Sequence, residues 1–89
     1  MSAPLVLEKS TVLQHITIGE LLVELGQKPA FARNTVNGVI ESLFRAAGLT
    51  PSSKLLSAAV RDLTQWEADR LIDAMRKQVA ATSAQAGAA

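Results

Sequence analysis

Few residues in this chain could carry out chemistry. There is a single histidine, His15, and there is neither cysteine nor tyrosine. Without cysteine, disulfides and thiolate metal sites are excluded, and His15 has no second ligand residue at the spacing of a metal site. The glycines are scattered and form no phosphate-binding loop. The sequence therefore predicts no metal, no cofactor and no small-molecule substrate.

An acidic group near the C-terminal end is the other place where catalysis could be considered. Asp69 and Asp73 fall on one face of an expected helix, with Glu67 close by. The basic residues interleaved with them are Arg70, Arg76 and Lys77. Such a mixture of signs is typical of a solvated helix face. We therefore expect a protein that is not an enzyme.

A third group of residues could bind nucleic acid. Residues 26–61 contain five basic side chains and one acidic side chain. Several polar residues gather where a helix is expected to begin, and a helix N-terminus favours phosphate. Residues of these types can also contact base edges. The candidates for nucleic-acid contact are Lys28, Arg33, Asn34, Thr35 and Asn37.

The spacing is unlike that of a standard helix-turn-helix, in which the turn has about three or four residues. Here the connection from Gly26 to Arg33 has about eight residues and includes Pro29. Asn34 and Thr35 are also ordinary helix-capping residues. We therefore favour two packing helices over a DNA-reading motif and keep DNA binding as the alternative.

Helix-capping and helix-stop residues along the chain predict an all-α bundle of three to four short helices. The first is expected at about residues 18–25, because Thr17 and Glu20 match a capping box and Gly26 is a natural stop. Its expected buried face is Ile18, Leu21, Leu22 and Leu25. The second is expected over about residues 35–47, capped by Asn34 or Thr35. Its expected apolar stripe is Val36, Val39, Ile40, Leu43 and Phe44.

The later helices have their own boundary signals. Gly48 and Leu49 suit a Schellman ending of the second helix, and Thr50-Pro51 suits the start of a third. The expected buried residues of the third are Leu55, Leu56, Ala59, Val60 and Leu63. Thr64 and Glu67 form a capping box for the fourth, whose buried face is Ala68, Leu71, Ile72, Met75 and Val79. Asp73 and Lys77 form a favourable i, i+4 pair.

The two ends of the chain are expected to differ from this helical domain. Residues 1–16 are predicted to be an extended N-terminal arm, although a helix capped by Ser10 is the alternative. An isolated extended arm must pair with something, most simply a second copy. Residues 17–79 form the helical domain, and the small, uncharged residues 80–89 are predicted to be a disordered tail.

Two of the three aromatic residues are candidates for a protein interface. Phe31 falls in a connecting loop, where local structure does not require a large apolar side chain. Trp66 lies near the start of the fourth helix, at the margin of its apolar stripe. Each could complete the core or anchor a protein partner.

Residues 48–77 resemble the helical C-terminal module of phage and plasmid recombination-associated proteins. The matching pattern is Leu63, Thr64, Glu67, Ala68, Leu71, Ile72 and Met75. The resemblance covers about a third of the chain. It implies a small appendage that docks on protein or DNA in a bacterial or phage accessory protein, and it implies no catalysis.

The bulk composition agrees with an interaction role. The net charge of +1 gives no strong general attraction to nucleic acid or membranes. No apolar run approaches the ~20 residues of a membrane span, and the N-terminus shows no secretory signal, so a cytoplasmic location is expected. We expect a small non-catalytic adaptor or accessory subunit that binds a protein partner or itself, as a homodimer.

The DNA-binding alternative makes a distinct prediction. If phosphate contacts dominate, affinity for duplex DNA falls steeply as salt rises, and Arg33→Ala reduces the slope of log K against log salt by about one. A gel-shift assay at several salt concentrations measures this slope. If protein contacts dominate instead, binding depends on Phe31 or Trp66 and changes little with salt.

Overall fold

The protein is all-α. The computed structural model describes residues 8–27 and 34–87, with side chains to residue 82. Across these ranges there are four helices and no strand. They are α1 (Val12–Glu24), α2 (Gly38–Ala46), α3 (Leu56–Arg61) and α4 (Gln65–Gly87). The predicted helical bundle is confirmed.

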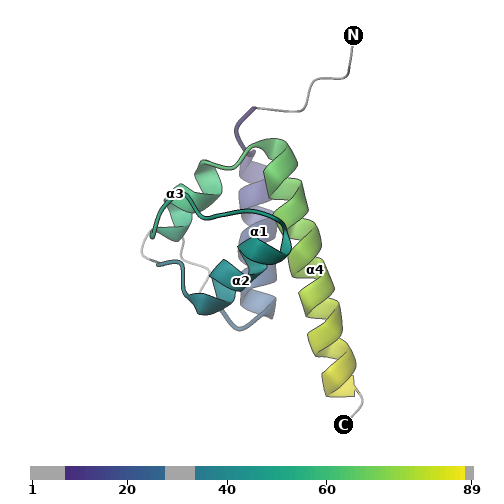
Figure 1. The fold of residues 1–89 in the computed structure, drawn as a ribbon. Coiled ribbons are helices and arrows are strands. Elements are labelled where there is room, and N and C mark those ends of the chain that lie inside the picture. The colour runs from purple at the N-terminus through teal and green to yellow at the C-terminus, as the bar shows by residue number, and fades with distance from the viewer. Residues whose placement is uncertain (1–7, 28–33, 88–89) are drawn as a thin grey trace.

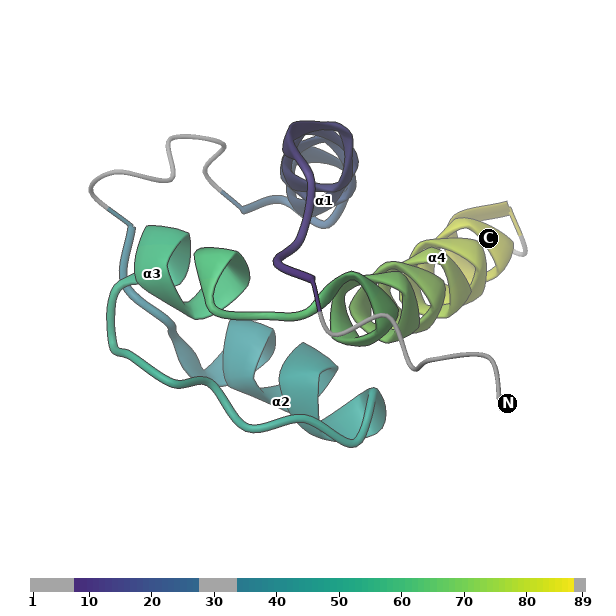
Figure 2. The ribbon, with the colours of Figure 1, turned by 90° about the horizontal axis from the view of Figure 1, so that it is seen from above.

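The four helices lie around a common centre in the view from above (Figure 2), and the buried apolar side chains form one cluster between them. α1 packs beside α4, and α2 packs against α4 from another side. The C-terminal end of α4 extends beyond the ends of the other helices (Figure 1). Because α4 contacts both α1 and α2, it is the helix on which the bundle is assembled.

Among the described residues, the core is aliphatic apart from the Phe44 ring and the Met75 thioether. Its buried members are Ile18, Leu21, Leu22, Ile40, Leu43, Phe44, Ala47, Leu49, Leu56, Ala59, Val60, Leu63, Ala68, Leu71, Ile72 and Met75. Among the residues that the structure describes, no polar or charged side chain is buried. Most members of the predicted stripes are confirmed as core. The exceptions are Val39 and Leu55, which are about half exposed, and Leu25, Val36 and Val79, which are partly buried.

α1 begins earlier than the sequence predicted. Its N-cap is Thr11, which forms a capping box with Gln14: Gln14 N donates to Thr11 Oγ1 (3.1 Å), and Thr11 N donates to Gln14 Oε1 (2.9 Å). The predicted Thr17–Glu20 box is wrong, because Thr17 Oγ1 lies inside the helix and donates to Leu13 O. Residues 12–16, predicted to belong to the arm, are therefore helical. Ser10 lies one residue before the cap.

The described part of the arm pairs within its own chain. Ser10 N donates to Leu63 O (2.9 Å), Gln65 N donates to Glu8 O (2.8 Å), and Lys9 forms a bridge with Thr64. The expectation that the arm pairs with a second copy therefore fails for residues 8–10. Residues 1–7 lie outside the described ranges.

α2 begins later than predicted, and its cap is Asn37 rather than Asn34 or Thr35. Residues 34–36 instead pair with residues 54–56: Val36 N donates to Lys54 O (2.8 Å), and Leu56 N donates to Asn34 O (2.9 Å). The same pairing explains why α3 does not begin at Thr50-Pro51. The backbone through Leu55 is used for this contact, and the helix starts only at the next residue.

The predicted Schellman ending of α2 is confirmed. Leu49 N donates to Phe44 O (2.8 Å) and Gly48 N donates to Arg45 O (2.9 Å), while Gly48 has a φ of 77°. Leu49 is buried in the same core cluster as Phe44. This ending redirects the chain from α2 toward α3 while keeping the orphan carbonyls bonded.

α4 has the predicted start and a later end. Glu67 N donates to Thr64 Oγ1 (3.1 Å) and Thr64 N donates to Glu67 Oε1 (2.9 Å), which confirms the capping box. The Asp73–Lys77 pair is also present, at 3.2 Å. The helix continues to Gly87, well into the segment 80–89 that was predicted to be a tail. Alanine, frequent in this segment, has the highest helix propensity.

Two glycine substitutions test the role of the Schellman turn. Gly48→Ala forces a side chain into a left-handed conformation, and its Cβ would lie 3.3 Å from an Arg70 nitrogen. We expect it to lower the free energy of unfolding by about 1–2 kcal/mol. Gly38→Ala, at the start of α2 with open space around it, should raise that free energy by up to about 1 kcal/mol. Urea unfolding followed by circular dichroism measures both; equal effects would contradict this account.

Candidate functional site

The three nucleic-acid candidates that the structure describes, Asn34, Thr35 and Asn37, all precede the first residue of α2. Lys28 and Arg33 lie outside the described residues. Asn34 and Thr35 belong to the extended segment that pairs with residues 54–56. Asn37 is engaged in the structure, since its Oδ1 accepts from Ile40 N (2.9 Å) and its Nδ2 donates to Gln27 Oε1 (2.9 Å).

The charge at the start of α2 also differs from that of a phosphate site. Glu41 lies in the first turn of α2 and forms an ion pair with Arg45. A carboxylate there satisfies the positive end of the helix dipole that a phosphate would otherwise bind. The described residues at this helix start are therefore poorly arranged for phosphate.

Of the two aromatic interface candidates, Phe31 lies outside the described residues and Trp66 is 47% exposed. The Arg70 guanidinium lies 4.8 Å from the centre of the Trp66 ring, and Arg70 Nε donates to Ala47 O (3.0 Å) at the end of α2. Trp66 is thus held on the α2 side of α4. Arg70 covers part of the ring, so a partner would contact only the remainder.

The sequence interpretation missed a larger apolar surface on α1. Val12 and Leu13 are 73% and 72% exposed, and Ile16 and Val23 are 54% and 50% exposed. On a helix with 3.6 residues per turn, these positions lie on one side. Ile18, Leu21 and Leu22 lie on the opposite side and are buried in the core. α1 is therefore apolar on both sides.

We name this surface the α1 outer face; its residues are Val12, Leu13, Ile16, Glu20, Val23 and Glu24. The two carboxylates are the only charged side chains of α1, and both lie in its C-terminal half. The first turn contains no acidic residue and the last turn contains no basic residue. The outer face is therefore aliphatic along its length and negative at one end.

This surface had a signal in the sequence. Residues 12, 13, 16 and 23 are all aliphatic, and they fall on the side of the helix away from the predicted stripe. This aliphatic pattern can be recognised as a helix face only when the helix starts at residue 12. With residues 12–16 interpreted as an extended arm, these side chains had no helical face to share.

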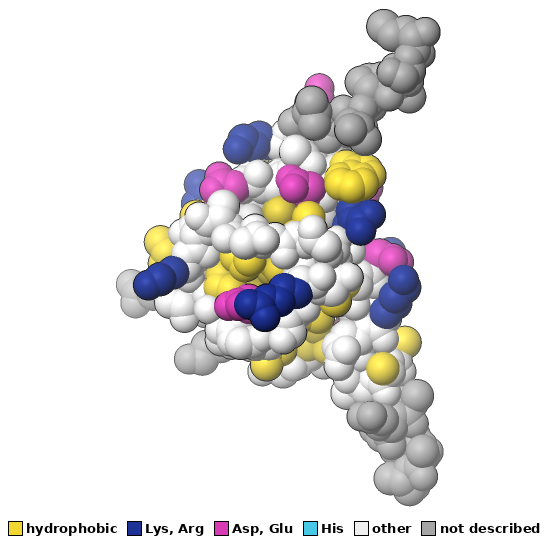
Figure 3. Space-filling view, viewed as in Figure 1, with side chains coloured by type: hydrophobic (Ala, Val, Ile, Leu, Met, Phe, Trp, Pro, Cys, Tyr) yellow, Lys and Arg dark blue, Asp and Glu magenta, His cyan; other side chains and the backbone are white. Residues whose placement is uncertain are grey.

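A second apolar surface lies where α1 ends beside α2 and α4. It is an open groove of about 540 Å³. Its lining residues are Glu24, Leu25, Gly26, Val39, Ser42, Leu43, Ala46, Ala74, Gln78 and Thr82. In the space-filling view, hydrophobic side chains are visible in the hollow between α2 and α4 (Figure 3). Glu24 belongs to both surfaces.

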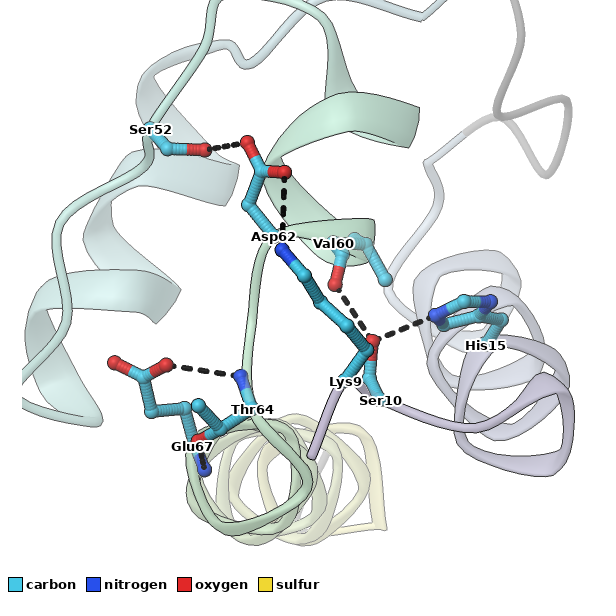
Figure 4. Close-up of polar contacts among 8 residues, drawn as sticks. All are labelled: Lys9, Ser10, His15, Ser52, Val60, Asp62, Thr64 and Glu67. Carbon is cyan, nitrogen blue, oxygen red and sulfur yellow. Dashed lines mark hydrogen bonds and ion pairs between the residues drawn. The ribbon is translucent and has the colours of Figure 1, made fainter. Parts of the chain in front are cut away.

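A polar cluster joins the start of α1 to α3 (Figure 4). Ser10 Oγ lies 2.7 Å from His15 Nε2, and the Ser10 hydroxyl donates to Val60 O (2.9 Å). Because the hydroxyl proton is used on Val60 O, the Ser10 oxygen accepts from His15 Nε2–H. A serine nucleophile needs the opposite arrangement, with the ring nitrogen accepting the hydroxyl proton. The pair therefore fits a structural role.

The other side chains in this region are also bonded to one another. Lys9 Nζ lies 3.8 Å from Asp62 Oδ1, and Ser52 Oγ donates to Asp62 Oδ2 (2.7 Å). Over the part of the chain that the structure describes, no three histidine, cysteine or carboxylate residues gather to hold a metal ion. The cluster connects the N-terminal segment to α3 and offers no open ligand set.

No family model matches this sequence, and searches of curated proteins and of solved structures find no match either. Within residues 8–27 and 34–87, no helix has both the length and the apolar character needed to cross a membrane.

The pKa of His15 yields a testable pH dependence. Burial lowers this pKa below its usual 6.5, and the nearby Arg61 guanidinium lowers it further. Below about pH 6.5 the unfolded chain therefore binds a proton more readily than the folded chain, so the contribution of His15 to stability is lost as pH falls through this range. We expect His15→Gln to remove this part of the pH dependence.

The measurement is the free energy of unfolding of both proteins between about pH 7.5 and about pH 5.5. All carboxylates are shared by the two proteins, so their contributions cancel in the difference. The advantage of the unsubstituted protein should shrink at the acid end. Parallel pH profiles would show that the folded state does not disfavour the charged His15.

Proposed function

We propose that this protein is a small non-catalytic adaptor or accessory subunit that binds a protein partner through the α1 outer face. The observation that carries the proposal is the exposure of four aliphatic side chains on a helix whose other side already fills the core. A helix with apolar residues on two opposite sides is normally covered on both of them. A contiguous exposed apolar patch is typical of an interaction surface.

The free energy available from burying these four side chains agrees with an anchoring surface. Complete burial of one aliphatic side chain contributes about 1.5–3 kcal/mol. Given their present exposures, covering Val12, Leu13, Ile16 and Val23 would contribute about 4–7 kcal/mol before the cost of association. This is enough to anchor a partner, and contacts beyond these four side chains would be needed for tight binding.

The chemistry of the face favours protein over nucleic acid. Glu20 and Glu24 are its only charged residues, and carboxylates repel the phosphate backbone. Its remaining side chains are aliphatic and provide neither stacking rings nor hydrogen-bond donors for bases. A partner would instead need an aliphatic surface with positive electrostatic potential near one end.

The alternative is a small DNA-binding accessory or regulatory protein that contacts phosphates through the start of the second helix. Its candidate residues remain Lys28, Arg33, Asn34, Thr35 and Asn37. It has less support, because the Asn37 side chain is engaged in capping and Glu41 occupies the first turn of α2. The salt dependence described above distinguishes the two hypotheses.

Photo-crosslinking in cells of the source organism tests the proposal. A photoreactive phenylalanine derivative is placed at Leu13, and separately at Val39 as a control, since Val39 is 50% exposed on α2. We expect a protein adduct from position 13 that decreases at least about tenfold when Ile16→Glu is added, since a charge on an apolar interface is costly.

Two results would count against the proposal. One is the absence of any protein adduct from position 13. The other is an equal or stronger adduct from position 39, which would move the interaction to the groove that Val39 lines. Circular dichroism of each variant checks that the helical fold is retained.

A further inference from the structure

We infer that the occupant of the α1 outer face is the same face of a second copy, with the two α1 helices packed antiparallel about a two-fold axis. This inference rests on the proposed function, because it names the partner of that surface. It follows from the positions of the apolar residues, from the charges of α1 and from the dimensions of the helix.

The apolar residues have the spacing that an antiparallel pair requires. Leu13 and Val23 are each five residues from position 18, and Ile16 and Glu20 are each two residues from it. A two-fold axis at the level of residue 18 therefore places Leu13 of one copy against Val23 of the other, at both ends of the contact. Ile16 of each copy then packs near the axis, against the aliphatic stem of Glu20.

The charges of α1 distinguish an antiparallel from a parallel pair. In a parallel pair, Glu20 and Glu24 of both copies would lie side by side, which is unfavourable for like charges. In an antiparallel pair, Glu24 of each copy lies beside the first turn of the other helix. That turn is the positive end of the helix dipole and contains no acidic residue of its own.

The same arrangement compensates the other end of α1. Its last turn contains Glu24 and no basic residue, so the carboxylate lies at the negative end of its own helix dipole. The N-terminus of a second α1 supplies the positive potential that this end lacks. Each helix end is therefore complemented by the opposite end of the same helix in another copy.

The length of α1 and the net charge of the chain set the expected affinity of the dimer. Thirteen residues at 1.5 Å per residue give a helix about 20 Å long. One such face buries less than the roughly 800 Å² per partner of a standard interface. The net charge of +1 places little electrostatic barrier against self-association. A reversible, concentration-dependent dimer is expected, and the two-fold arrangement closes on two copies.

The experiment uses the absence of cysteine from the natural chain. Leu13→Cys and Val23→Cys variants of the full chain are mixed in equal amounts and oxidised with copper phenanthroline and air, which accept the two electrons and two protons released by each disulfide. An antiparallel pair should yield mainly the mixed 13–23 disulfide, well above the half expected from random collision. Mass spectrometry separates the three products.

Sedimentation equilibrium of the cysteine-free protein supplies the second measurement. We expect a reversible monomer–dimer equilibrium, and Ile16→Glu should weaken the dimer at least about tenfold. Val39→Glu, at a side chain of similar exposure on α2, should leave it unchanged. Circular dichroism shows whether each variant is folded, and Ile16→Ser is a milder substitution if Ile16→Glu unfolds the protein.

The outcomes separate the inference from the proposed function. Mainly 13–13 and 23–23 disulfides would indicate a parallel pair and overturn the inference. A monomer at every concentration would also overturn it, while a crosslink from position 13 to a different protein would leave the proposed function intact. A monomer with no crosslink from position 13 would overturn both.

Discussion

The fold depends on the backbone pairing between residues 8–10 and residues 63–65. Through it, the segment before α1 is bonded to the segment before α4, so the two helix starts lie side by side. Gln14 extends the contact, since its Nε2 donates to Gln65 O (3.0 Å) and to Asp69 Oδ1 (2.8 Å). With their starts joined, α1 and α4 run alongside each other. One side of α1 then meets the core and the other meets solvent.

A second backbone pairing joins the segments that precede α2 and α3. Residues 34–36 bond to residues 54–56, immediately before α2 and α3. Each pair of helices is thus positioned by a short stretch of extended chain rather than by a tight helical hairpin. The helices themselves contribute the apolar side chains that pack together as the core. Neither pairing is local in sequence, so neither left a periodic pattern from which it could be predicted.

The difference between local helix signals and long-range backbone pairings explains which features could be predicted from the sequence. The Thr64–Glu67 box and the Gly48–Leu49 ending involve residues within one helical turn or its cap, and both were predicted correctly. The start of α1 was not, because Thr11–Gln14 and Thr17–Glu20 offer nearly the same local chemistry. The helix begins at the earlier pair because Ser10, just before it, bonds to Leu63 and to Val60. Both partners lie 50 or more residues away in the sequence. The candidate site was missed for the same reason.

The α1 outer face is not explained by the needs of folding. The buried side of α1 already places Ile18, Leu21 and Leu22 in the core, and an amphipathic helix needs no apolar residues opposite that side. Polar residues at positions 12, 13, 16 and 23 would leave the described core contacts unchanged. A chain of this size buries only about 60% of its unfolded surface, which makes additional burial between molecules favourable. The four exposed aliphatic side chains are therefore surface that the fold itself does not use, and this is the physical basis of the proposed contact with another molecule.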